Sequence, residues 1–454
     1  MKVSSGGCLG RRLSASAMGE YQMDTAPQSG KTQCPISRVK VDTLDLMQQV
    51  LRSKAVEENA DVSADNYVCP NALAATNVRE FQQGNLVMSN GDVHRQRRRM
   101  LNSLVRPEQL VRFREDIILP SVDRWMGRMV KRNDDGTFGC DLANVVELIF
   151  LEFAAKIIGI EGVESEEGMA RLRGCALPIF GGLSAAHFED REGVTKAGIE
   201  AKAVFVDEFY RPSLEYTRQQ LKRLEAGELT EEDVPLNLLQ MIATQAHETY
   251  ADEDVGIKEA ILFFVATTGT SVQAVLSTVE YLLDWFEKHP DDRACVEDME
   301  FISNALQEAL RLRAPFVPFL TRLAVEDLNV GDVQLKAGDE VQAWVARAGR
   351  DAAIFGDDAN EFNPRREVPE GISRYGLAFA TGAHQCLGLR TVLGNDGKSG
   401  SHLRLVQGLF RAGIRRDPKV QAQTLPLKAS DDPRDQIPTY ISFPVILDNW
   451  SPRS

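Results

Sequence analysis

Apolar residues recur at helical spacing through most of the first half of the chain. The recurrence begins near Thr43 and is clearest in TLDLMQQVLRS, EQLVRFREDIILPSVDRWMGRMV and LANVVELIFLEFAAKIIGI. Positions three and four apart share one face of a helix, so each segment predicts a helix with a buried stripe. The first half is therefore predicted to be mostly helical.

The longest periodic segment runs from Asp254 to Lys288 and stops at His289-Pro290. At about 1.5 Å per residue it predicts a helix about 50 Å long, apolar around much of its circumference and therefore in the core. Its middle, ATTGTS, is small and polar. We expect a local distortion there, because Thr and Ser hydroxyls bond back to the preceding turn and Gly weakens a helix. A packing crossing that needs small side chains is the alternative.

After Pro315 the pattern changes to short β-like runs, LTRLAVEDLNVGDVQLKAGDEVQAW, with Gly-Asp turns between them. Another β-like run, TYISFPVIL, follows later. The predicted fold class is mainly α with small β-sheets.

Composition favours one large soluble domain. The chain has 454 residues, of which 43% are hydrophobic, and no Pro/Gly/Ser-rich linker interrupts its interior. We predict a single domain over residues 37–454. Residues 1–36 lack the apolar stretch of a secretory signal, and we predict a flexible leader there.

Charge and cysteine usage exclude several classes of protein. The net charge of −14 argues against general affinity for nucleic acid or an anionic membrane surface, and no apolar run approaches the length of a membrane span. The seven cysteines are scattered and never spaced as CxxC, so neither a disulfide framework nor a zinc ribbon is indicated. A cytoplasmic location fits best.

One cysteine lies in a glycine-rich segment, FATGAHQCLG. Gly382 and Gly388 bracket Cys386 closely enough for the backbone to wrap the sulfur and point N–H groups at it, which suits a thiolate. A lone cysteine is more often a buried structural residue. Zinc would need about four ligands, and only His384 and His402 lie near in sequence. A catalytic nucleophile is also weakly supported, because the spacing supplies no adjacent base.

This segment resembles the heme-binding loop of cytochrome P450 proteins, Phe-x-x-Gly-x-His/Arg-x-Cys-x-Gly, at every diagnostic position. The resemblance implies heme b as the cofactor, held by Cys386 as the axial thiolate. It makes Phe379 the ring that shields the sulfur and His384 a contact of a heme propionate, with Gly382 and Gly388 as the loop glycines. It also implies the family's fold, in which the long central helix crosses the heme.

Further segments match the same family in the correct order. EALR and FNPRR place Glu308, Arg311 and Arg366 where the family has an ion-paired structural triad. Glu-x-x-Arg alone is weak evidence, since EFYR at 208–211 has the same spacing. Position decides for Glu308, because it precedes the β-like region and the cysteine segment.

The segment HRQRRRM resembles the family's His/Trp-x-x-x-Arg helix, in which His94 and Arg98 hold a propionate. Arg322 matches a third propionate-binding position. The neighbouring arginines at 95, 97 and 99 form a basic run, whose default interpretation is a solvated face. The resemblance implies that an acidic ferredoxin or flavodoxin docks near this helix.

In the long helix, ATTGTS lies in register with the family's Ala/Gly-Gly-x-Asp/Glu-Thr-Thr. Thr270 occupies the alcohol position and Ser271 the next, but Gly269 stands where the family has its acid. The acid and alcohol organise the protons that dioxygen cleavage needs. Water beside Thr270, or a polar group of the substrate, would have to replace the acid.

The resemblance also suggests a substrate pocket, whose apolar lining favours an apolar substrate. We predict that it is lined by Phe263, Phe264, Ala266, Thr267, Thr270, Phe316, Val317, Phe319 and Leu320. CALPIFGGLSAAHF is a candidate lid with Gly181-Gly182 as its hinge; an ordinary interhelical loop is the alternative. Two departures from the family are expected to be structural: short N-terminal strands, and GNDGKSG, predicted to be a surface turn in a normally continuous helix.

The resemblance implies a soluble, monomeric heme-thiolate monooxygenase that oxidises a small apolar molecule with dioxygen. Its electrons would come from a separate redox partner, because the chain holds no flavin or nicotinamide domain. Gly269 keeps one rival open, a peroxide-dependent or non-monooxygenase heme-thiolate enzyme for rearrangement or N-transfer. A non-catalytic heme sensor is the second rival.

Overall fold

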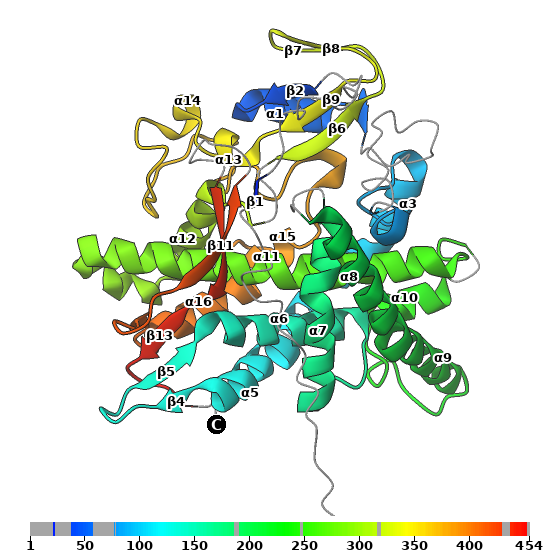
Figure 1. The fold of residues 1–454 in the computed structure, drawn as a ribbon, viewed down its shortest axis with the longest axis horizontal. Helices are drawn as coiled ribbons and strands as arrows, with labels where there is room; N and C mark the ends of the chain where they lie inside the picture. Colours follow the sequence, from blue (N-terminus) through cyan, green and yellow to red (C-terminus); the bar gives the residue numbers. More distant parts are fainter. Residues whose placement is uncertain are drawn as a thin grey trace, which may run out of the picture.

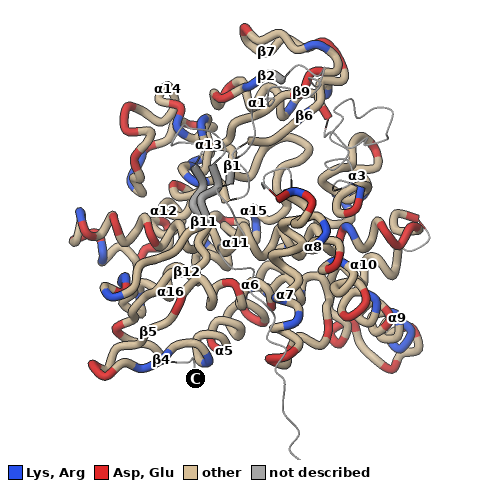
Figure 2. The backbone as a smooth tube through the Cα atoms, in the orientation of Figure 1, with Lys and Arg blue, Asp and Glu red and all other residues tan. Residues whose placement is uncertain are grey.

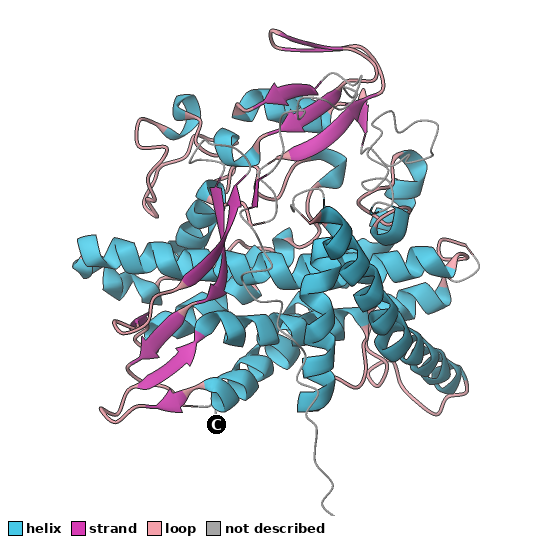
Figure 3. Cartoon of the chain, in the orientation of Figure 1, coloured by secondary structure: helices cyan, strands magenta, loops and turns pink. Residues whose placement is uncertain are grey.

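The computed structural model describes residues 21–22, 38–57, 77, 79–185, 190–245, 248–315, 319–428 and 436–451. Helices form the bulk of this part, and the strands are short (Figure 3). The helical segments are α1 Leu44–Arg52, α3 Gly91–Leu101, η2 Asn102–Val105, α4 Pro107–Arg112, η3 Phe113–Ile118, α5 Leu119–Met129, α6 Leu142–Ile158, α7 Glu166–Leu183, α8 Arg191–Val204, η5 Phe205–Tyr210, α9 Arg211–Glu225, α10 Leu238–Thr244, α11 Glu253–Lys288, η6 Pro290–Glu297, α12 Met299–Leu312, α13 Val345–Ala348, α14 Ala352–Phe355, η7 Gly382–His384, α15 Leu389–Leu393 and α16 Ser401–Arg411.

Helix α11 crosses the middle of the molecule (Figure 1) and confirms the predicted long helix. It begins at Glu253, is capped by Asp252, whose carboxylate accepts the N–H of Asp254, and ends before Pro290. The expected distortion in its middle is absent, since the helix is continuous through ATTGTS. The hydroxyls of Thr268 and Thr270 do bond back to the preceding turn, at 2.8 and 2.6 Å, without breaking the helix.

Helix α6 packs against α11 and shows why this core is stable. It is apolar around almost its whole circumference, which is typical of a helix covered on all sides. Asp141 caps its first turn, and Gly159 ends it at a φ of +98°, a conformation that favours glycine. Each fully buried Leu, Ile or Phe along it contributes about 1.5–3 kcal/mol.

The described strands form four small sheets, and the β-like segment predicted after Pro315 supplies strands to two of them. One sheet lies at the edge of the molecule that is uppermost in Figure 3, with the order β2 Arg38–Val41, β9 Glu340–Ala343, β6 Leu320–Ala324, β3 Val56–Glu57. The others are β1 Tyr21–Gln22, β11 Gln423–Lys428 and β12 Gln436–Ser442; β10 Arg415–Arg416, β13 Pro444–Leu447, β5 Phe138–Asp141 and β4 Lys131–Arg132; and the hairpin β7 Leu328–Val330 with β8 Val333–Leu335.

The N-terminal strands are short, as expected: β2 has four residues and β3 has two. Strand β2 runs parallel to β9, and β9 is antiparallel to β6. Within the predicted leader, the structure describes Tyr21–Gln22, which pairs with β11. A flexible leader over residues 1–36 stays a prediction.

The predicted hinge at Gly181-Gly182 is wrong. Both glycines are buried in the last turn of α7, where a Cβ on Gly182 would lie 3.0 Å from the Cα of Gly198 in α8. They are needed because the backbones of α7 and α8 approach closely at this crossing. The rest of the candidate lid, up to Ala185, is mostly helical, and residues 186–188 lie outside the described residues.

Acidic and basic positions are interspersed over most of the fold, but the middle of α11 carries none between Glu259 and Glu280 (Figure 2). Among the described helices, α11 is the one long and apolar enough to cross a membrane by length and composition. The most apolar part of α11 is 72% buried inside the fold, as in the core helix of a globular protein.

Candidate functional site

Residues 379–388, which we call the cysteine loop, wrap the sulfur of Cys386 as the sequence suggested. The N–H of Cys386 donates to the carbonyl of Phe379 at 2.8 Å, which closes the loop. The N–H groups of Gly388 and Leu389 bond to the sulfur and lower the pKa of the thiol, but burial has the larger effect and raises it. Cys386 nevertheless keeps accessible surface, so one side of it remains open.

The shape of the loop depends on Gly382 and on its contact with α1. Gly382 has a φ of +76°, and a Cβ there would lie 2.4 Å from the carbonyl oxygen of Leu51. Arg52, at the end of α1, donates to Thr381 at 3.2 Å. Phe379 is buried beside the sulfur-bearing turn, with its ring edge-on to that of Tyr375. The first helix thus fixes the position of the loop.

The four predicted propionate contacts converge on this loop from three separate elements. His94 in α3 lies against His384, with ring centroids 4.1 Å apart. Burial, together with the nearby His94, Arg322 and Arg98, lowers the pKa of His384 to about 3, and burial has the largest effect. His94 is buried, and its Nε2 has no hydrogen-bond partner in the described part of the chain.

Arg98 is half-buried, and its charge also acts on Cys386. Burial lowers the pKa of Arg98, and the cysteine sulfur opposes this effect. Arg322 is buried in β6 and donates to the carbonyl of Thr321 at 2.7 Å. These two guanidinium groups make the surroundings of the loop electropositive.

The middle of α11 has an open face. Ala266 and Gly269 are exposed although the helix is otherwise largely buried, and Thr270 is half-buried. A Cβ added at Gly269 would meet nothing within 4 Å. Gly269 therefore faces open space, which excludes the packing crossing as the reason for its small size. Ser271, the next predicted residue, is buried.

The predicted pocket residues divide into accessible and buried groups. Phe263 and Thr267 are half-buried on α11, whereas Phe264 is fully buried and stacks on Phe205 at 5.1 Å. Phe264 is therefore a core residue. Leu320 is half-buried, and Phe319 packs against Trp344. Phe316 and Val317 lie outside the described residues.

Glu308, Arg311 and Arg366 form one buried network. Glu308 accepts from Arg311 at 2.6 and 2.8 Å and from Arg366 at 2.9 Å. Its side chain has no exposed surface. The two arginines also donate to backbone carbonyls of the segment 349–361. The network ties α12 to the irregular segment that leads into the cysteine loop. The other Glu-x-x-Arg segment, EFYR, forms no such network, since Glu208 pairs with Arg171 and not with Arg211.

The basic run on α3 is not wholly solvated, which corrects the prediction for Arg97. Arg95 and Arg99 are exposed, but Arg97 is buried beside Glu259 of α11. Helical geometry turns the side chain at position 97 away from its two neighbours and toward the core. The sequence analysis did not single out Glu259. A carboxylate in the apolar part of the long helix could have indicated a buried residue that needs a charged partner.

The turn GNDGKSG separates α15 from α16 and is held by specific bonds. The Asp396 carboxylate accepts the N–H groups of Lys398 and Ser399 at 2.9 and 2.8 Å. Ser303 of α12 donates to the carbonyl of Gly397 at 2.6 Å. The segment is therefore an ordered turn.

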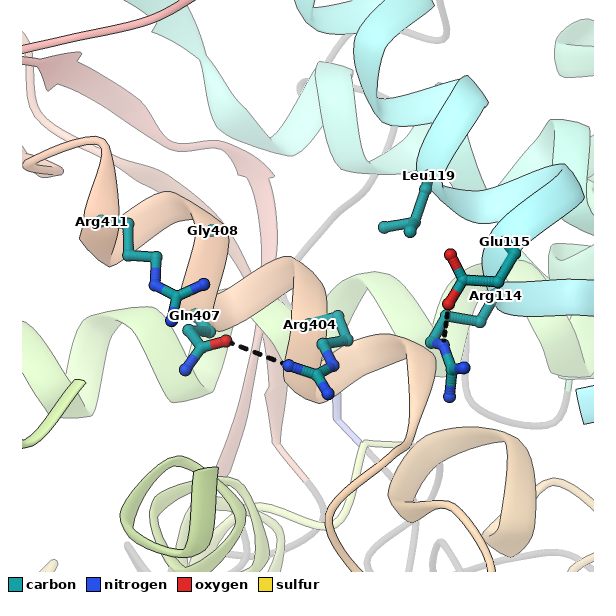
Figure 4. A pocket seen from close by; sticks show the side chains of 7 residues that line it. All are labelled: Arg114, Glu115, Leu119, Arg404, Gln407, Gly408 and Arg411. Atoms are coloured by element: carbon teal, nitrogen blue, oxygen red, sulfur yellow. Dashed lines mark hydrogen bonds and ion pairs between the residues drawn. The ribbon is translucent and has the colours of Figure 1, made fainter. Parts of the chain in front are cut away.

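A surface groove of about 440 Å³ lies beside α16 (Figure 4). Its lining residues are Arg114, Glu115, Leu119, Arg404, Gln407, Gly408 and Arg411. Arg114 binds Glu115 at 2.6 Å, and Arg411 binds Glu297 outside the groove at 2.5 Å. Most of its positive charge is thus matched within the protein, and none of the predicted site residues lines it.

Comparisons with known proteins give a family match for part of the chain and a fold match for most of it. Residues 259–391 match the family model described as Cytochrome P450. Among solved structures, CalO2 superimposes with a TM-score of 0.66 at 17% identity over 92% of this chain and 93% of that one. P450BioI in complex with an acyl carrier protein gives 0.64 at 18% identity over 90% and 92%. Together these matches support the cytochrome P450 superfamily, and the solved structures show the cytochrome P450 fold over about 90% of this chain.

The curated proteins that this chain resembles match it over short segments. Cytochrome P450 130 of Mycobacterium tuberculosis is 34% identical over 140 residues, which is 30% of this chain and 33% of the relative. Indoleacetaldoxime dehydratase of Arabidopsis thaliana is 36% identical over 106 residues, 22% of this chain and 21% of the relative. The matches span a third or less of the length of these relatives.

Cytochrome P450 proteins bind heme b through a cysteine thiolate, and this chain's residues fit that group. Cys386 has an open side and N–H groups directed at its sulfur. The buried Nε2 of His94, which has no partner among the described residues, would be free to bind a propionate. Arg98 and Arg322 would balance propionate charge. Among the described residues no group of three or more His, Cys, Asp or Glu side chains could hold a metal ion instead.

Proposed function

We propose that this cytochrome P450 is a heme-thiolate oxidoreductase, in the first place a monooxygenase that oxidises a small apolar molecule. The observation that carries the proposal is the convergence of His94, Arg98 and Arg322 on His384 of the cysteine loop, together with the charge of Arg98 beside Cys386. Heme bound there would favour O–O cleavage, because thiolate donation pushes electron density toward the iron.

The protein's own residues would hold the cofactor and supply protons. Cys386 would give up its proton on ligation, and the N–H groups of Gly388 and Leu389 would stabilise the sulfur's negative charge. The hydroxyl of Thr270 donates to the carbonyl of Ala266, so its oxygen is left to accept a hydrogen bond from water on the open face of α11. Water would then enter the open space beside Gly269.

The substrate class follows from the lining of α11. Phe263 and Ala266 present apolar surface beside the open face, and no charged side chain lies on α11 between Glu259 and Glu280. Structural neighbours were solved with corticosterone or with an acyl carrier protein ligated to hexadec-9Z-enoic acid, both largely apolar groups. We infer an apolar substrate for this protein as well.

Electrons would come from a separate ferredoxin or flavodoxin. Exposed Arg99 on α3 offers positive charge to an acidic partner near the heme-holding face, whereas Arg95 beside it is paired with Asp92. The described cysteines are free thiols, which suits a reducing cytoplasm. We propose a soluble, monomeric, cytoplasmic protein with no nucleic-acid or membrane partner.

Gly269 favours a second candidate function. The position faces open space and carries no acid, so proton delivery to dioxygen depends on water alone. A curated relative is named a dehydratase, an activity that consumes no dioxygen. The second candidate is therefore a heme-thiolate enzyme that uses peroxide or rearranges its substrate without an oxidant.

The deciding experiment is a spectrum of the reduced protein under carbon monoxide. Wild-type protein should show the strongly red-shifted band of thiolate ligation, and Cys386→Ser should lose it while Cys295→Ser retains it. An unchanged spectrum in Cys386→Ser would overturn the proposal. Turnover with reductant and dioxygen, with peroxide, or with neither then separates the two candidate functions.

A further inference from the structure

The buried pair Arg97 and Glu259 joins the heme-holding helix to the central helix. The Nε of Arg97 lies 3.6 Å from a carboxylate oxygen of Glu259. Their side chains are 5% and 0% exposed. Arg97 also lies over the ring of Tyr250, with its guanidinium carbon 5.5 Å from the ring centroid. Two groups of opposite charge are thus enclosed between α3 and α11.

The same pair holds the segment that precedes α3. Arg97 donates to the carbonyl of Gly84 and to the hydroxyl of Ser89, the latter at 3.2 Å. Glu259 accepts the N–H of Leu86 at 3.2 Å. Both ends of residues 84–89 are therefore fixed by Arg97, and the middle by Glu259. The segment lies against α11 one turn before Phe263.

Burying the charges of Arg97 and Glu259 costs free energy unless each charge keeps its partner. Burial raises the pKa of Glu259 to about 7, and Arg97, the Leu86 N–H and the Tyr250 hydroxyl oppose that rise. Buried ion pairs rarely add stability over apolar residues of the same size, so geometry is a better explanation for their presence. Arg97 follows His94 by three residues and precedes Arg98, so whatever orients Arg97 also orients them.

We propose that Arg97 and Glu259 are positioning residues that set α3 against α11 and so hold His94 and Arg98 at the cofactor. The inference rests on the proposed heme site. Neither residue touches the cysteine loop in any described contact, so they act through α3 and residues 84–89.

The test compares Arg97→Met with Arg95→Met, a matched change on the exposed face of α3. Heme transfer from the holoprotein to a heme-scavenging apo-globin measures retention, and amide hydrogen exchange reports on residues 84–101. Arg97→Met should release heme at least about tenfold faster and exchange faster at 84–89, whereas Arg95→Met stays within about twofold of wild type.

The double variant Arg97→Met/Glu259→Leu separates positioning from stability. It removes both buried charges, so its unfolding midpoint should return to that of wild type or exceed it. Heme release should nevertheless remain fast. Wild-type heme release in the double variant would overturn the proposal, even where Arg97→Met fails to fold. Loss of the thiolate band in wild-type protein would instead defeat the proposed function.

Discussion

The rings of His94 and His384 lie against each other, 4.1 Å between centroids and tilted by 32°, although one comes from α3 and the other from the cysteine loop. Their contact joins α3 to the loop that carries Cys386. Because the Nε2 of His94 is buried without a described partner, the ring carries a polar atom that a bound carboxylate would satisfy.

Replacing His94 by Phe should weaken cofactor retention while keeping the ring contact. Loss of one hydrogen bond to a charged group costs about 1.5–3 kcal/mol, so heme release should accelerate roughly ten- to hundredfold. Stopped-flow transfer to an apo-globin measures the rate. His289→Phe, at an exposed ring at the far end of α11, serves as the control. Equal rates in wild type and His94→Phe would contradict a propionate contact here.

Gly269→Asp should increase the coupling of dioxygen consumption to product. The new side chain meets no obstacle within 4 Å, and a positioned acid commonly contributes about 10²-fold or more to proton transfer. Product formed per reductant oxidised is the measurement. Gly269→Ala controls for the gain in helix propensity. If the two variants behave alike, the missing acid does not limit turnover.

The Glu308 network should be essential for stability. Glu308→Gln leaves Arg311 and Arg366 without their shared carboxylate in a fully buried place, which costs about 3–5 kcal/mol. Denaturant unfolding measures the change. Glu208→Gln, which removes an exposed ion pair with Arg171, should have no measurable effect. Similar losses of unfolding free energy in both variants would show that burial of the Glu308 network does not cause its effect on stability.

His402 should make the protein sensitive to acid. Burial lowers its pKa to about 3, and neither ring nitrogen has a partner among the described residues. The unfolded ring binds a proton near pH 6.5, so stability is lost as pH falls from 6.5 toward 3, by about 2 kcal/mol at pH 5. His402→Leu should remove this part of the pH dependence of the unfolding midpoint. His289→Leu should leave it, and an unchanged slope in His402→Leu would refute the assignment.

Sequence patterns predicted the long helix to within one residue, since α11 begins at Glu253 and the segment was expected from Asp254. The resemblance to the cytochrome P450 family, rather than any local pattern, placed Arg366 with Glu308 and Arg311, since Arg366 lies 58 residues from Glu308. Helical periodicity and short motifs are local properties that survive folding unchanged. The prediction of a distortion in ATTGTS was wrong, because the hydroxyls of Thr268 and Thr270 bond to the preceding turn within a regular helix.

The sequence by itself determined the helices, the small sheets and the segment that holds Cys386, because spacing and residue type encode them locally. Only the tertiary structure decided which side of each helix is covered. It turned Arg97 inward to Glu259, buried Phe264 against Phe205, and left Gly269 facing open space. These outcomes depend on segments distant in the chain, whose approach no single stretch of sequence contains.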